Sequence, residues 1–514
     1  MLSLRGKPLV YLVTIVSSTG FCLFGYDNGL MGQVISEPSF LDVVGNPDAA
    51  VQGFAVSSYD VGCMFGALAA LVISEQMGRR RTILLACVVH LIGDVLNASS
   101  YSLAQFLVSR IILGMGLGLF TSASPVWLAE TATAQMRAVM VAVQLTFLII
   151  GTNLAYWVDY GLGFLDNEIS WRVPFALQAV YPILAFAFTL FLPESPRWLA
   201  AHGQTEAAAV ALSAFRDLPE DHEMIRAELQ DIASAIALEA DGESWGALFR
   251  QGPSKVRTRI IIACAANAMQ SYSGINFVEY YFPFILTNSV GLSTNIANLV
   301  AGCSQVWFLL SSFLTWYYIN KLGRRRLFYL GNIGMGCCMV AVCITLWKDT
   351  HTSAILTIIF FFIYLSFFTW GWMSNMWTYP AEIVPLHVRG KAMALSVIFQ
   401  FANQFWTVEI APVTIDSIGW RTYIIWAVLN FACCVVVYLF FPETSALTLE
   451  SVDFLFSSSR NIREVVARSE QLWSNHYHLE VGAAAAAAAG SDGKEKAMEA
   501  GAAQVSHVEG PAQE

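Results

Sequence analysis

The sequence predicts an all-α membrane protein with twelve transmembrane helices in two pseudo-symmetric six-helix halves. The chain has 514 residues, of which 56% are hydrophobic and 13% are charged. Soluble proteins carry about 25% charged residues, and here the deficit extends along the whole chain. A membrane-spanning helix needs ~20 mostly apolar residues, and twelve stretches provide them without the two-residue alternation of barrel strands. These stretches are 9–30, 51–73, 82–100, 104–128, 138–160, 172–192, 258–287, 293–319, 327–347, 353–379, 391–412 and 420–441.

Three short motifs occur twice in the same order, which indicates that one half is a copy of the other. The two copies lie 245, 252 and 249 residues apart. The motifs are Gly-Arg-Arg-Arg at 78–81 and 323–326, Ala-Glu at 129–130 and 381–382, and Pro-Glu-Ser or Pro-Glu-Thr at 193–195 and 442–444. Parallel repeats of this kind build transporters that bind their substrate between two halves, near the bilayer midplane.

Basic residues between the predicted spans gather on one side of the membrane. Cytoplasmic loops carry an excess of Lys and Arg, so this side and both termini are predicted to be cytoplasmic. The net charge of −10 gives no indication of nucleic-acid binding. All ten Cys residues lie in apolar stretches without metal-ligand spacing, so no metal, cofactor or disulfide is predicted.

The repeats and the orientation together divide the chain into four predicted parts. The last part becomes rich in Ala, Gly and Glu, a composition that cannot form a core and predicts disorder toward the end. The parts are an N-terminal six-helix half at 1–192, a cytoplasmic linker with short helices at 193–257, a C-terminal six-helix half at 258–441 and a cytoplasmic tail at 442–514.

Asp27 and Arg110 are charged residues inside predicted spans. A charge at mid-bilayer costs ~2.5–3.5 kcal/mol, which makes each intramembrane charge a functional candidate. If the two side chains pair, a proton on Asp27 would break the pair and deprotonation would restore it. We interpret them as a proton switch, and the alternative is a static salt bridge that fixes helix packing. The other ionisable residues singled out within the spans are Asp60, His90, Asp94, Glu279 and Glu409.

Neutral polar side chains are scattered through otherwise apolar spans. Amides both donate and accept hydrogen bonds, which suits hydroxyl groups, and an indole face suits the C–H face of a pyranose ring. An anion site would need several Arg or Lys residues, so the set favours a neutral, carbohydrate-like substrate. The alternative is interhelical hydrogen bonding, worth ~0.6 kcal/mol on average. The set comprises Gln144, Gln178, Gln270, Ser271, Asn276, Gln400 and Gln404, accompanied by Tyr280, Tyr281 and Trp377.

The ordered motifs resemble the sugar porter family of the major facilitator superfamily, in its fungal branch. The likeness covers nearly the whole chain, from Phe21 to Asp453. It implies the major facilitator fold and alternating access of a sugar site to the two sides of the membrane. The motifs that carry it are Gly25-Tyr26-Asp27, Gly78-Arg79-Arg80, Arg110, Pro125, Glu130 with Arg137, Pro193 to Leu199, Gly274-Ile275-Asn276, Tyr280-Tyr281, Tyr379 to Glu382 and Pro442-Glu443-Thr444.

The resemblance also implies which residues carry the function. Proton-coupled members use an Asp of helix 1 with an Arg of helix 4, which correspond to Asp27 and Arg110. The expected substrate-binding residues are Gln144, Gln270, Ser271, Asn276, Tyr280, Trp377 and Gln400. The expected salt bridges of a cytoplasmic gate involve Arg79, Arg80, Glu130, Arg137, Glu194, Arg197, Arg324, Arg325, Glu382, Arg389 and Glu443.

Some residues depart from the family pattern. Ser271 replaces the second Gln of a common pair, and Phe401 stands where many members have Trp. Gln144 lies one position before the frequent binding Gln. Residues 371–376 contain no proline, which leaves open whether helix 10 breaks there. These departures preserve the class and leave the sugar undetermined.

The function predicted from the sequence is proton-coupled uptake of a hexose or pentose by a monomeric, multi-pass protein of the plasma membrane. Its expected partners are the sugar, the proton and the lipid bilayer. No nucleophile–base or metal arrangement indicates an enzyme. The alternatives are a passive facilitator, a porter of a disaccharide, polyol or quinate-like acid, and a non-transporting sugar sensor.

Overall fold

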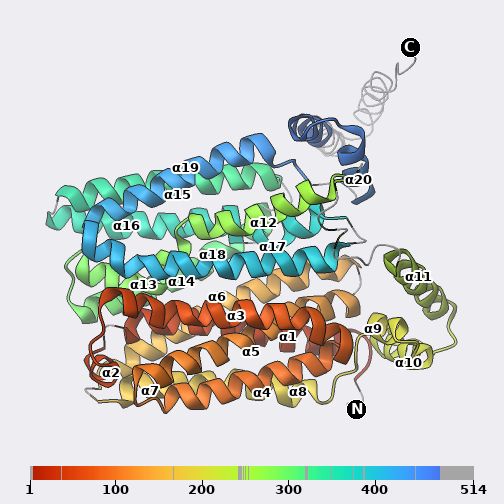
Figure 1. The fold of residues 1–514 in the computed structure, drawn as a ribbon, viewed down its shortest axis with the longest axis horizontal. Coiled ribbons are helices and arrows are strands. Elements are labelled where there is room, and N and C mark those ends of the chain that lie inside the picture. Colours follow the sequence, from red (N-terminus) through yellow and green to blue (C-terminus); the bar gives the residue numbers. More distant parts are fainter. Residues whose placement is uncertain are drawn as a thin grey trace, which may run out of the picture.

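The computed structural model describes residues 4–474 with short gaps. The gaps are 36, 133, 166, 241–245, 247, 249–250, 253, 319–321, 349, 374, 386–387, 446 and 448. The described residues form long helices that run side by side, with the N-terminal helices below and the C-terminal helices above in Figure 1.

The N-terminal helices trace six paths. A short helix, α2 (Pro38–Val44), connects the first path to the second at the end of the bundle far from the termini, here named the α2 end (Figure 1). The sixth path consists of two helices that meet at Ala179. The paths are α1 (Lys7–Val34), α3 (Ala49–Met77), α4 (Arg79–Ala98), α5 (Leu103–Thr131), α6 (Ala134–Leu162), and α7 (Ile169–Gln178) with α8 (Val180–Thr189).

The C-terminal helices trace six further paths, two of which are interrupted. The short turn η4 (Gly419–Arg421) joins the last two paths. The paths are α12 (Val256–Tyr272) with α13 (Ile275–Asn288), α14 (Thr294–Tyr318), α15 (Arg324–Lys348), α16 (His351–Phe368) with η2 (Thr369–Met373) and α17 (Asn375–Ile383), α18 (Arg389–Ile418) and α19 (Thr422–Phe440).

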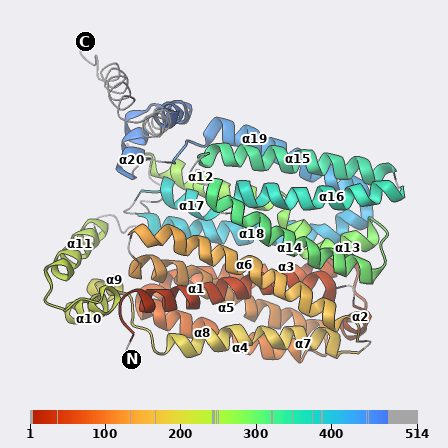
Figure 2. The ribbon, with the colours of Figure 1, turned by 180° about the vertical axis from the view of Figure 1, so that it is seen from behind.

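Five shorter helices lie at the other end of the bundle, beside the two ends of the described chain; this end is here named the terminal end. Figure 2 shows them at that end when the molecule is seen from behind. They are α9 (Pro196–Ala201), α10 (Thr205–Arg216), α11 (Glu223–Ala240), α20 (Leu449–Ser458) and an unlabelled helix at 462–474. The boundaries of the four predicted parts stay a prediction.

The predicted all-α membrane fold is confirmed. Nine helical stretches of the described residues are long and apolar enough to cross a membrane, and one of them, Arg389–Phe440, runs through α18 and α19. With that stretch counted as two paths, α6 and the α12–α13 pair complete the twelve spans of the predicted fold. Large apolar side chains such as Leu68, Val95 and Val428 are exposed on the outside of the bundle, where a lipid bilayer would cover them.

Glycines allow the helices of the N-terminal half to approach closely. A Cβ on Gly114 would lie 2.1 Å from the Tyr59 carbonyl oxygen, and one on Gly118 would lie 2.2 Å from that of Cys63. Both contacts join α5 to α3. The glycine series in α5 therefore serves helix packing, as small residues do in membrane proteins.

Two interrupted paths of the C-terminal half bring irregular backbone to the middle of the bundle. Gly274 adopts φ +90° between α12 and α13, a left-handed conformation that favours glycine. The Ser273 carbonyl freed there accepts hydrogen bonds from Tyr364 (3.0 Å) and Asn430 (2.8 Å). In helix 10 the winding changes: α16 passes into the wider, π-helical stretch η2, and this happens without any proline. Irregular backbone inside a membrane protein commonly lines a substrate cavity.

Candidate functional site

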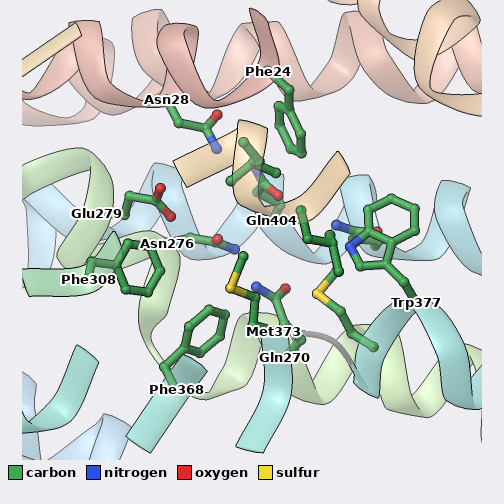
Figure 3. Close-up of a pocket in the computed structure, with 14 residues that line it drawn as sticks. Phe24, Asn28, Gln270, Asn276, Glu279, Phe308, Phe368, Met373, Trp377 and Gln404 are labelled. Atoms are coloured by element: carbon green, nitrogen blue, oxygen red, sulfur yellow. The ribbon is translucent and has the colours of Figure 1, made fainter. Parts of the chain in front are cut away.

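A cavity lies between the two halves, beside both interrupted helices. Figure 3 shows amide, carboxylate, aromatic and thioether side chains directed toward it. Its lining residues are Phe24, Asn28, Leu145, Leu148, Gln270, Asn276, Glu279, Phe308, Phe368, Met373, Met376, Trp377, Gln400 and Gln404. Hydrogen-bonding amides beside an indole and apolar walls suit a ligand that carries hydroxyl groups on a carbon frame.

Four of the seven predicted substrate residues line this cavity: Gln270, Asn276, Trp377 and Gln400. Ser271 lies behind two of them. Its hydroxyl is 3.4 Å from the Gln270 Oε1 and 3.4 Å from the Asn276 amide nitrogen, so it orients both amides. These five residues come from α12, α13, α17 and α18.

Tyr280 and Gln144 occupy different positions from the four lining residues. The Tyr280 hydroxyl donates to the Asn28 side-chain oxygen at 2.5 Å and accepts from Gln404 at 2.9 Å, so it connects two lining residues across the halves. Gln144 is buried but is not among the lining residues; Leu145 and Leu148 of the same helix line the cavity instead.

Three further polar lining residues, Asn28, Glu279 and Gln404, are not among the seven predicted substrate-binding residues. Gln404 and Glu279 can be recognised in the sequence as polar residues within apolar spans. Their position in the cavity depends on how α13 and α18 pack against α1. Asn28 directly follows Asp27 in the sequence, which was the available signal for it.

The two halves contact one another on both sides of the cavity. Toward the α2 end, Ser57 donates to the Glu409 carboxylate at 2.6 Å, and Tyr156 donates to the Glu279 backbone carbonyl at 2.6 Å. Toward the terminal end, aromatic rings meet edge to face. Phe21 lies 5.6 Å from Trp377 between ring centroids. The cavity is thus enclosed by polar contacts at one side and aromatic contacts at the other.

Asp27 and Arg110 form a fully buried ion pair inside the N-terminal half. The Arg110 Nη1 lies 2.6 Å from the Asp27 Oδ1, and both side chains are 0% exposed. Gln178 also donates to Asp27 at 3.2 Å, and the Arg110 guanidinium stacks on the Tyr59 ring at 4.6 Å. The predicted contact between Asp27 and Arg110 is therefore present, one residue away from the cavity-lining Asn28.

Besides this pair, buried acids lie at three further places in the N-terminal half: the His90–Asp94 pair, Asp60, and Asp159 of α6, which is 4% exposed. His90 Nδ1 lies 3.1 Å from Asp94 on the same face of α4, as their spacing predicts. Asp60 is 1% exposed on α3, and among the described residues its carboxylate has no hydrogen-bond partner.

At the terminal end, polar contacts join the first Gly-Arg-Arg-Arg motif to Glu130 and Glu194, the acids of the other two repeated motifs in the same half. Arg79 binds Glu130 at 3.0 Å. The Glu194 carboxylate accepts the backbone N–H groups of Arg79 (3.0 Å) and Arg80 (3.1 Å), and so caps α4. A carboxylate at this position compensates both the free N–H groups and the positive end of the helix dipole.

The C-terminal half repeats this cluster. Arg324 binds Glu382 at 2.9 Å. The Glu443 carboxylate accepts the backbone N–H groups of Arg324 (2.8 Å) and Arg325 (3.0 Å), and so caps α15. Burial raises the pKa of the Glu443 carboxyl, and the backbone N–H groups that bind it, from Ser445 among others, oppose this rise.

These clusters contain eight of the eleven predicted gate residues, and the contacts described join helices within one half. Arg80 donates to the backbone carbonyls of Thr189 and Leu190, and Arg389 to that of Val384. Arg197 precedes α10 and makes further interactions. The side chain of Arg137 lies outside the described residues.

Gly78→Ala is expected to lower the free energy of unfolding by about 1–3 kcal/mol, the cost of a conformation open essentially to glycine alone. Gly78 has φ 90° and ψ 165°, and an added Cβ would lie 2.4 Å from the Glu194 Oε2. The thermal unfolding midpoint in detergent measures the effect. Gly390→Ala is the matched control, because nothing lies within 4 Å of a Cβ there. Equal midpoints for the two variants would contradict the capping account.

Comparison with known proteins agrees with this architecture. The family described as "Sugar (and other) transporter" matches residues 12–456. The chain belongs to this family. It is a multi-pass membrane protein of a transporter family, and the prediction that it is not an enzyme is confirmed.

Individual members of the family resemble the chain over most of its length. The MFS-type transporter oryC of Aspergillus oryzae is 36% identical, over 89% of this chain and 87% of that protein. The sugar transporter STL1 of Saccharomyces cerevisiae is 32% identical, over 89% of this chain and 83% of that protein. A structure of the proton:xylose symporter XylE from E. coli, bound to 6-bromo-6-deoxy-D-glucose, is 25% identical, with a TM-score of 0.72 over 88% of this chain and 100% of that one.

Proposed function

We propose that this protein takes up a monosaccharide, a hexose or a pentose, together with a proton by alternating access. The observation that carries the proposal is the position of the Asp27–Arg110 pair. It is wholly buried at 2.6 Å, and Asp27 is followed directly by Asn28 on the cavity wall. A proton on Asp27 would release Arg110 beside the substrate site, which links protonation to the packing of α1, α3 and α5.

The chemistry of the cavity supports a sugar as the substrate. Gln270, Asn276 and Gln400 offer amides that both donate and accept hydrogen bonds, and Trp377 offers an aromatic face. The sugar-bound XylE symporter has the same fold. The sugar transporter STL1, which is 32% identical to this chain, supports the same class of substrate.

The arrangement of the loops and of the contacts around the cavity supports one orientation of the protein in the membrane and a mechanism of alternating access. The arginine-rich loops and the two ends of the described chain lie at the terminal end (Figure 1), which the positive-inside rule assigns to the cytoplasm. The α2 end then faces outward, and we place the protein in the plasma membrane as a monomer. The polar contacts of Ser57 and Tyr156 would open toward the outside, and the aromatic contacts of Phe21 would open toward the cytoplasm.

A passive facilitator is the alternative function. The full burial of Asp27 and Arg110 is compatible with a pair that only stabilises packing. In that case the same cavity would transport sugar without a dependence on the proton gradient.

Counterflow exchange of labelled glucose and xylose in proteoliposomes tests sugar transport independently of coupling. The wild-type protein is expected to exchange at least one of the two sugars. Gln270→Ala is expected to weaken the apparent affinity about ten-fold or more, since an unpaired buried polar group costs ~1–3 kcal/mol. Gln305→Ala is the control, because Gln305 is buried on α14 and does not line the cavity. Exchange of neither sugar by the wild-type protein would contradict the proposal.

A further inference from the structure

Glu279 is a carboxylate on the wall of the cavity. Figure 3 shows it directed toward the space between Asn28 and Asn276. Its position is fixed at the boundary of the halves, because Tyr156 of α6 donates to its backbone carbonyl at 2.6 Å. The Thr152 hydroxyl lies 3.4 Å from its Oε1. The side chain is only 7% exposed, and its carboxyl group faces the cavity and not open solvent.

The Glu279 carboxyl has no counter-ion among the described residues that line the cavity. None of the described lining residues is Arg, Lys or His. Arg110, the buried cation of the neighbouring pair, binds Asp27 at 2.6 Å. A buried charge without a partner is unfavourable, so the carboxylate gains from any ligand that brings hydrogen-bond donors or a positive charge.

We propose that Glu279 selects the substrate by charge: it favours neutral polyhydroxyl sugars and positively charged amino sugars, and it excludes sugars that carry a carboxylate. The inference rests on the proposed function, because it requires that this cavity holds the sugar. It narrows that function to one substrate class and rejects acids such as uronic acids and quinate-like compounds.

Two physical effects produce this selection. Sugar hydroxyls donate charge-assisted hydrogen bonds to the carboxylate, and such bonds are roughly twice as strong as those between neutral groups. A substrate carboxylate would face a like charge in a cavity of low dielectric constant, where repulsion is far less screened than in water. An ammonium group gains from the same field. The remaining lining residues are amides, aromatic rings and apolar side chains, so they do not offset it.

The test compares how glucosamine, glucose and glucuronate displace labelled glucose from the purified protein, at a neutral pH at which the glucosamine ammonium, the glucuronate carboxylate and the Glu279 carboxylate are all available in their charged forms. Labelled xylose replaces labelled glucose if only xylose binds. The wild-type protein is expected to bind glucosamine at least about ten-fold more tightly than glucuronate. Glu279→Gln is expected to reduce this ratio about ten-fold and to weaken the binding of glucose as well, because its charge-assisted hydrogen bonds to sugar hydroxyls become neutral ones.

Glu409→Gln provides the matched control. Glu409 is also an acid at the boundary of the halves, but it accepts a hydrogen bond from Ser57 at 2.6 Å and does not line the cavity. Its replacement is expected to leave the glucosamine-to-glucuronate ratio unchanged. An equal loss of the ratio in both variants would overturn the assignment to Glu279.

The outcomes separate this inference from the proposed function. Glucose binding with an unchanged ratio in Glu279→Gln would overturn the inference alone. A ratio near one in the wild-type protein would overturn it as well, whether or not the variant folds. Binding of neither glucose nor xylose by the wild-type protein would contradict the proposed function, and the inference with it.

Discussion

Asp27→Asn is expected to abolish the proton-driven accumulation of sugar, while exchange of sugar across the membrane continues. The amide keeps the size of the side chain and still accepts a hydrogen bond from Arg110, but it cannot bind and release a proton. A membrane potential of about 100 mV supplies ~2.3 kcal/mol per charge. At ~1.4 kcal/mol per ten-fold ratio, one proton supports roughly forty-fold accumulation. The variant is expected to reach equilibrium only.

The measurement uses proteoliposomes with an inward proton gradient for accumulation, and without one for counterflow. Asp94→Asn is the matched control, because Asp94 is a buried acid of the same half that pairs with His90 at 3.1 Å. It is expected to keep accumulation, since its pair lies on a single helix. Normal accumulation by Asp27→Asn would contradict the assignment of the coupling site.

Arg110→Gln is expected to destabilise the protein by about 3–5 kcal/mol, because removal of one partner leaves a buried charge uncompensated. Asp27 is 0% exposed, and Gln178 at 3.2 Å would be its remaining described hydrogen-bond donor apart from the new amide. The thermal unfolding midpoint in detergent should fall clearly. The double variant Asp27→Asn/Arg110→Gln should regain much of the loss, because neither buried charge is then left.

Arg226→Gln is the control for this series. Arg226 pairs with Asp221 at 3.2 Å, but the side chains are 70% and 95% exposed, and exposed pairs contribute ~0–1 kcal/mol. Its midpoint is expected to equal that of the wild-type protein. A midpoint for Arg110→Gln as high as that of Arg226→Gln would show that Asp27 carries no charge in the folded protein.

Most of the helices could be predicted, because the bilayer thickness requires about 20 apolar residues in each span, and hydropathy detects stretches of that length. The ends were less predictable. The sequence placed the start of one span at residue 82, whereas α4 begins at Arg79. Hydropathy could not detect this extra turn, because it depends on the Glu194 carboxylate that caps the helix from more than a hundred residues away. The π-helical stretch after Phe368 could not be predicted, since it forms without the proline that usually signals irregular helix backbone.

The candidate site was predictable where the residue type itself is unusual in a membrane. Asp27 and Arg110 stood out as intramembrane charges, and their contact is present. The cavity wall was less predictable, because it depends on which faces of the helices meet. Asn28 and Glu279 line the cavity through the approach of α1 and α13, whereas Gln144 is not among the lining residues although its motif suggested a binding residue.

Proton-coupled sugar transport is tested most directly by the internal pH of proteoliposomes during sugar entry. Wild-type protein is reconstituted without an imposed proton gradient, a pH-sensitive dye is enclosed, and glucose or xylose is added outside. The account predicts that the interior acidifies as the sugar enters, and that Asp27→Asn admits sugar without acidification. Sugar entry through the wild-type protein at constant internal pH would contradict coupling and identify a passive facilitator.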